Sequence, residues 1–91
     1  MRYLFRVHAV RRMFERRISR EEARAVIEYG QVVEDYPDDR PYPSRLMLGF
    51  REGRPIHVVV ADNLADGERI VITAYEPSPE QWDALFLRRK P

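Results

Sequence analysis

The sequence predicts an α+β fold, with two N-terminal helices packed on one face of a four-stranded antiparallel meander sheet and a short C-terminal helix. Apolar residues recur at helical spacing as far as Gly30, and the period changes to two between Gln31 and Tyr75. A new helix-start signal follows Pro77. The chain has 91 residues and no repeat or linker, so we expect one domain over residues 1–91.

The first helix is predicted over residues 5–17. Its apolar sector on a helical wheel consists of Ala9, Val10, Met13 and Phe14, and its polar sector of His8, Arg11, Arg12, Glu15 and Arg16. His8, Arg12 and Arg16 are spaced i, i+4, i+8, so they lie along one flank. This flank is either a solvated helix face or a phosphate-binding surface.

The second helix is predicted between Ser19 and Gly30. Ser19 suits the N-cap, and Glu22 occupies the reciprocal position of a capping box. Ile18 is placed to staple against Ala23. Gly30 suits a left-handed helix stop.

Alternating apolar residues predict the four strands of the meander over residues 31–36, 44–50, 54–62 and 68–75. The proline-rich segment 37–43 separates the first two strands, because proline cannot join a central ladder.

The C-terminal helix is predicted from Ser78 as cap, Pro79 at the first helical position and Gln81 at the box position. Its apolar stripe consists of Trp82, Leu85 and Phe86, and its basic end of Arg88, Arg89 and Lys90.

Charge is unevenly distributed on a chain whose net charge is only +1. Residues 1–30 hold eight arginines against four glutamates, whereas residues 31–66 hold four arginines against seven acidic residues. This imbalance indicates one basic surface. The absence of cysteine excludes disulfides and thiolate metal sites. Without an apolar run of membrane length or a signal peptide, we expect a cytoplasmic protein with no membrane contact.

His57 is the central candidate for chemistry. A hairpin closed over residues 62–67 places His57 opposite Thr73 or Tyr75, and we expect Val71, Thr73 and Tyr75 to share one sheet face. An imidazole, a hydroxyl and a phenol within reach form a general acid–base set. The alternative is a packed, hydrogen-bonded histidine. The strand pattern leaves open whether Arg45 or Leu48 completes this face.

Other catalytic signatures are missing from the sequence. It contains no glycine-rich phosphate loop, nucleophile elbow or His-x-x-His pair. Asp38 and Asp39 lie in a proline-rich loop and fit turn chemistry rather than metal binding. We therefore expect neither a metal nor a cofactor.

The stretches HAVRRMFERRIS, YGQVVEDYPDDRPYPSRLML, RPIHVVVA and VITAYEPSPEQWD together resemble DUF4258, a bacterial domain family of unknown function. The resemblance covers roughly residues 5–84, and the motifs agree in order and spacing. That family is grouped with RelE-like and BrnT-like toxins of toxin–antitoxin pairs, often encoded beside a zinc-finger antitoxin. The resemblance thus implies a RelE-like fold, a zinc-finger antitoxin as partner and cleavage of messenger RNA.

Such ribonucleases need no metal, because a base activates the 2′-hydroxyl, basic residues stabilise the phosphate and an acid protonates the leaving 5′-oxygen. The positions that match the family motifs are His8, Arg12, Arg16, His57, Thr73 and Tyr75. The resemblance implies His57 or His8 as base or acid, Arg12 and Arg16 on phosphate, and Tyr75 stacking or donating a hydrogen bond. Arg88 and Arg89 are further candidates for phosphate.

Two features favour another class of function. The isoelectric point near 8.1 is low for an RNA-cleaving toxin, and the acidic segment 31–66 would repel RNA. The alternatives are a non-catalytic domain that binds a protein partner or nucleic acid, and a toxin fold with structural duties only. A ribonuclease needs His57, Thr73 and Tyr75 to converge with Arg12 and Arg16. A binding domain needs only an exposed patch, and an apolar strip along the last helix would indicate a partner or a homodimer.

Overall fold

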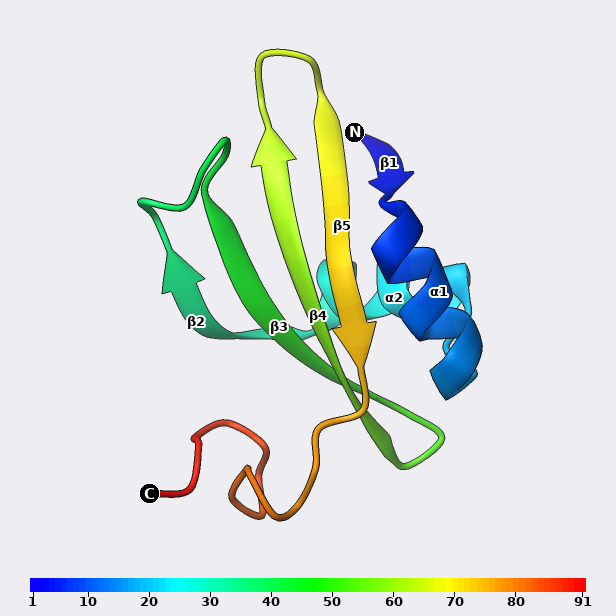
Figure 1. Cartoon of the computed structure of the whole chain (residues 1–91), viewed down its shortest axis with the longest axis vertical. Helices are drawn as coiled ribbons and strands as arrows, with labels where there is room; N and C mark the ends of the chain where they lie inside the picture. Colours follow the sequence, from blue (N-terminus) through cyan, green and yellow to red (C-terminus); the bar gives the residue numbers. More distant parts are fainter.

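The computed structural model describes residues 1–91 as a curved sheet with two helices on one face (Figure 1). The elements in chain order are β1 (Arg2–Phe5), α1 (Val7–Arg16), α2 (Arg20–Tyr29), β2 (Gln31–Tyr36), β3 (Ser44–Arg51), β4 (Arg54–Asn63) and β5 (Glu68–Tyr75). The sheet has the strand order β1-β5-β4-β3-β2. Neither helix is long and apolar enough to cross a membrane.

The predicted four-stranded antiparallel meander is wrong, because a fifth strand makes the sheet mixed. β1 runs parallel to β5, from the pair Arg2 and Glu68 to the pair Phe5 and Val71. Tyr3 and Phe5 pack against the buried core, so the N-terminus gains apolar burial as a strand. The predicted helix 5–17 consequently begins only at Val7.

The predicted C-terminal helix is also wrong. Residues 76–91 form a coil with one isolated bridge between Trp82 and Arg89 (Figure 1). Phe86 has a φ of 59°, which no right-handed helix contains. Ser78 accepts from the amide of Glu80, closing a local turn instead of capping a helix. The coil buries Trp82 against the sheet, and this tertiary contact overrides the local helix signals.

The structure confirms the second predicted helix and its N-terminal capping box. The Ser19 hydroxyl accepts from the Glu22 amide, and the Glu22 carboxylate accepts from the Ser19 amide, so the capping box is complete. The four predicted strands of the meander are present within one residue of their expected ends.

Gly30 ends α2 for a different reason from the one predicted. Its φ is −79°, so it is not left-handed, but a Cβ there would lie 2.4 Å from the backbone oxygens of both Val26 and Leu48. Glycine therefore permits the close approach of α2 to β3. The left-handed stop belongs to Arg17, with a φ of 56°, where Arg54 donates to the carbonyls of Arg16 and Arg17.

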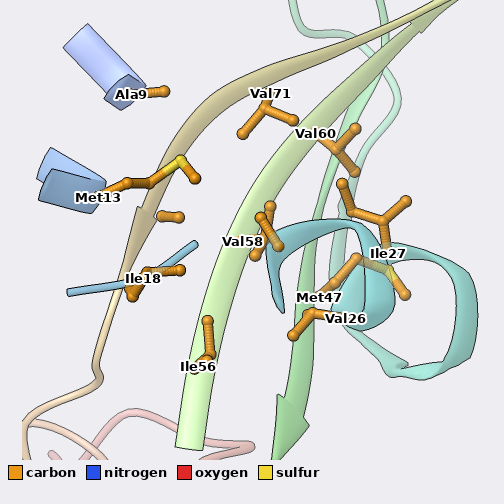
Figure 2. Close-up of a cluster of buried hydrophobic side chains, with 12 residues drawn as sticks. Ala9, Met13, Ile18, Val26, Ile27, Met47, Ile56, Val58, Val60 and Val71 are labelled. Carbon is orange, nitrogen blue, oxygen red and sulfur yellow. The ribbon is translucent and has the colours of Figure 1, made fainter. Parts of the chain in front are cut away.

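The main core lies between the helices and one face of the sheet (Figure 2). Its twelve buried residues are Ala9, Met13, Ile18, Ala23, Val26, Ile27, Met47, Ile56, Val58, Val60, Val71 and Ala74. Ile56, Val58 and Val60 share this face, as the alternation in β4 predicts. His57 therefore points to the other face, away from the helices.

A β-bulge in β5 decides which side chains join His57. Val60 pairs with Val71 but Val59 pairs with Thr73, so Ile72 is the extra residue. Val71 consequently packs in the helix-side core, whereas Thr73 and Tyr75 lie on the His57 face. The predicted common face is wrong for Val71 because strict alternation does not survive a bulge.

We predict that Gly30→Ala lowers the free energy of unfolding by about 2 kcal/mol or more, because the new methyl group forces α2 and β3 apart. Urea unfolding measures the loss. The matched control is Gly53→Ala, where no atom lies within 4 Å of the added Cβ and only the φ of 78° is strained. That variant is expected to lose only about 1 kcal/mol. Equal losses would contradict the assignment of Gly30 to close packing.

Candidate active site

His57 lies completely buried on the sheet face away from the helices, with 0% of its surface exposed. Its neighbours across the strands are Leu48 in β3 and Tyr75 in β5. Leu48, not Arg45, therefore sits directly beside it. Of the two pairings that the sequence leaves open, the structure selects Tyr75.

Both ring nitrogens of His57 have a hydrogen-bond partner. Nε2 lies 2.9 Å from the carbonyl oxygen of Phe86, and Nδ1 lies 3.3 Å from the hydroxyl of Tyr75. A carbonyl only accepts, so Nε2 carries the proton and Nδ1 accepts from the tyrosine. The backbone of Phe86 thus fixes the tautomer of the imidazole and aims its lone pair at Tyr75.

Burial lowers the pKa of His57 below its ordinary value; the hydrogen bond to Phe86 opposes this shift, and the guanidinium of Arg89 adds to it. His57 is therefore a neutral acceptor at pH 7.

The C-terminal coil seals this histidine from solvent. The ring of Trp82 meets that of His57 edge to face at 4.5 Å between centroids, and Trp82 is itself only 3% exposed. The guanidinium of Arg89 lies 4.7 Å from the centroid of the Trp82 ring. Trp82 and Arg89 thus form a lid over His57, and Tyr75 is the polar group between this histidine and the surface.

Tyr75 is half-buried at the end of β5. Burial raises the pKa of its phenol, while the positive charges of Arg89 and Arg12 oppose this rise. Thr73, also half-buried, lies on the same face one step along the strand. The phenol is thus a neutral donor with two cations in electrostatic range.

Arg12 lies on α1 and acts on Tyr75 through its charge. β1 pairs with β5 only as far as Val71, and α1 packs along β5. The Nε of Arg12 is buried without a hydrogen-bond partner. Because a desolvated guanidinium donor without a partner costs free energy, an anionic ligand beside Arg12 would be stabilised.

The other predicted site residues form no hydrogen bond with His57 or Tyr75. His8 is exposed on α1, which packs on the opposite face of the sheet from His57, so the two histidines do not meet. Arg16 is exposed in the last turn of α1, and Arg88 is exposed in the C-terminal coil. The structure thus places His57, Tyr75 and Thr73 on one face, where the positive charges of Arg89 and Arg12 act on Tyr75.

Sequence reasoning missed three contributors. Two of them are Trp82 and the Phe86 carbonyl, because the local helix signals around these residues give no indication of their contact with His57. Tyr36 is the third. Burial raises the pKa of its phenol, and the hydrogen bond to Glu34 raises it further. The charge of Tyr75 also raises this pKa, whereas that of Arg89 lowers it. The alternation of QVVEDY, which puts Glu34 and Tyr36 on one face, is the signal that would have found Tyr36.

An open pocket of about 600 Å³ adjoins Tyr36. Its lining residues are Asp35, Tyr36, Pro37, Asp38, Asp39, Ser44 and Val59. Three carboxylates make this pocket unfavourable for a phosphate. No group of three or more histidine or acidic side chains is placed to hold a metal ion.

The family assignment rests on the sequence profile of the domain of unknown function DUF4258, which matches residues 5–76. This match covers most of the chain, so the protein belongs to the DUF4258 family. It includes the motifs that carry Arg12, His57 and Tyr75 but ends before Trp82 and Arg89. No curated protein and no solved structure matches the chain.

We predict that His57 makes the protein less stable in mild acid. The unfolded imidazole binds a proton below about pH 6.5, whereas folded His57 stays neutral to lower pH, so protons favour the unfolded state. The stabilisation is complete above about pH 6.5 and is lost as the pH falls towards the folded pKa, with a slope of at most about 1.4 kcal/mol per pH unit.

Urea unfolding between about pH 7.5 and pH 5 measures this slope. His57→Gln is expected to flatten it, and His8→Gln, which removes the exposed imidazole, is the matched control. The same slope in wild type and His57→Gln would contradict a buried neutral His57.

Proposed function

We propose that this protein is a toxin-type, metal-independent endoribonuclease that cleaves messenger RNA, with Tyr75 and two arginines at its reacting centre. The observation that carries the proposal is a phenol that hydrogen-bonds to a buried neutral histidine and feels the positive charges of Arg89 and Arg12. Two guanidinium groups near one hydroxyl suit a phosphodiester, whose negative charge grows in the transition state.

In this mechanism the 2′-oxygen attacks the adjacent phosphorus and releases its proton to water. The hydroxyl of Tyr75 turns its hydrogen from Nδ1 of His57 to the leaving 5′-oxygen, and the bond between phosphorus and that oxygen breaks as the oxygen takes the proton, leaving a tyrosinate that water reprotonates. Arg12 and Arg89 stabilise the phosphate and the transient tyrosinate. Because burial raises the pKa of Tyr75, the phenol serves as an acid and not as a base at neutral pH.

His57 is a positioning residue in this proposal. It is fully buried and contacts the site only through the Tyr75 hydroxyl, so it orients the phenol without touching RNA. The proposal therefore moves the chemistry from the histidines, which the sequence favours, to Tyr75.

The toxin role also draws on the grouping of DUF4258 with RelE-like and BrnT-like toxins. That grouping supports a cytoplasmic protein that acts on messenger RNA and is neutralised by a cognate antitoxin of the zinc-finger type.

A non-catalytic domain is the second candidate, and the burial of His57 favours it. A histidine with both nitrogens bonded, beneath Trp82, has the environment of a structural residue. In that case Tyr75, Arg12 and Arg89 bind a phosphate without cleaving it. Binding and cleavage are separable by experiment.

We predict that the purified protein cleaves single-stranded RNA in the presence of a metal chelator, and that Tyr75→Phe slows cleavage by about 100-fold or more. Arg12→Gln is expected to weaken both RNA binding and cleavage, because it removes one of the two positive charges that act on the phenol. Gel analysis of end-labelled RNA measures cleavage, and fluorescence anisotropy measures binding.

Arg16→Ala is the matched control, since Arg16 lies on the same helix but outside the Tyr75 group, and it should cleave at the wild-type rate. Growth arrest on induced expression should follow the same order of variants. If wild type binds RNA without cleaving it, the non-catalytic candidate replaces the toxin. If Tyr75→Phe cleaves as fast as wild type, the assigned acid is wrong.

A further inference from the structure

The outer side of α1 carries an unusually exposed apolar strip. Phe14 is 86% exposed, Val7 72% and Val10 37%. These residues follow the spacing i, i+3, i+7, which places them on one ridge of the helix. The strip is thus distinct from the buried side of α1, where Ala9 and Met13 meet the sheet.

Two hollows adjoin Val10 and Phe14, and we call these hollows, together with the ridge between them, the groove. One, of about 620 Å³, is lined by Phe5, Val7, Val10, Arg11, Phe14 and Glu15. The other, of about 220 Å³, is lined by Val10, Met13, Phe14, Ile18, Ser19 and Arg20. The groove therefore runs from the end of β1 to the start of α2.

The lining of the groove holds two basic side chains, Arg11 and Arg20, and one acidic side chain, Glu15. Residues 1–20 contain seven arginines and a single acidic residue, Glu15. Arg11 and Arg20 line the groove, and neither forms an ion pair with a carboxylate. An occupant with acidic flanks would therefore gain electrostatic attraction that nothing within the chain supplies.

We infer that this groove docks an acidic amphipathic helix of a partner protein. An apolar ridge at i, i+3, i+7 between two hollows is the complement of a helix with apolar residues at the same spacing. Glutamates beside that stripe would meet Arg11 and Arg20.

Two other occupants fit less well. A second copy of the chain would bring the same arginines against one another, because a two-fold interface joins identical patches. An RNA strand would gain only one strongly exposed ring, that of Phe14, to stack on, and it would meet Glu15. The aliphatic Val7 and Val10 instead suit a protein helix.

This inference goes beyond the proposed RNA cleavage and does not rest on it. The groove contains none of the residues gathered around Tyr75, so a partner could occupy it whether or not the protein cleaves RNA.

The test is fluorescence anisotropy with a labelled helical peptide of about 18 residues that carries leucines at i, i+3, i+7 and glutamates on both flanks. A peptide with lysine in place of every glutamate and a single-stranded oligouridylate are the competing probes. Binding of the acidic peptide is expected to be at least about tenfold tighter than that of the lysine peptide. It should weaken at least about tenfold in Phe14→Ala.

Leu64→Ala is the matched control, because Leu64 is 78% exposed and outside the groove, and it should bind the acidic peptide like wild type. Unchanged circular dichroism and thermal midpoint would establish that Phe14→Ala is folded. The inference is overturned if the acidic peptide does not bind, if Phe14→Ala binds it like wild type, or if oligouridylate competes for the Phe14 site more strongly than the peptide.

Discussion

The hydrogen bond from the buried imidazole of His57 to the backbone carbonyl of Phe86 is the constraint on which the site depends. It ties the C-terminal coil to the centre of the sheet and leaves one ring nitrogen as an acceptor. A buried polar group is tolerated only when its hydrogen bonds are made, so the coil and Tyr75 must both be in place around this histidine. The same bond that holds the chain end therefore sets the orientation of the phenol at the surface.

Two local irregularities of the sheet determine where the phenol lies relative to the charge of Arg12. The bulge at Ile72 turns Thr73 and Tyr75 to the face opposite Val71. The short β1 ends opposite Val71, and α1 packs against β5. Arg12 can therefore influence Tyr75 although α1 belongs to the helix side of the sheet. Without the bulge, Val71 and Tyr75 would lie on the same face of β5, so either Val71 would leave the core or Tyr75 would leave His57.

Local signals predict the parts of the fold that local chemistry determines. The capping box of Ser19 and Glu22 predicts α2, and the hairpin over residues 62–67 predicts that His57 pairs with Thr73 or Tyr75, of which the structure selects Tyr75. They fail where tertiary contacts decide: MRYLF becomes a strand because β5 has a free edge for it, and the segment after Pro77 loses its helix because Trp82 packs on His57. The positions of Arg12 and Arg89 depend on these two tertiary features, so sequence patterns alone do not predict them.

The tautomer of His57 is the most direct test of this account. Long-range proton–nitrogen NMR correlation of the histidine side chains at neutral pH distinguishes which ring nitrogen carries the proton. The account predicts a neutral imidazole protonated at Nε2, with Nδ1 free to accept from Tyr75. Protonation at Nδ1, or at both nitrogens, would contradict it, since Tyr75 would then have no acceptor in the ring and its orientation would need another cause.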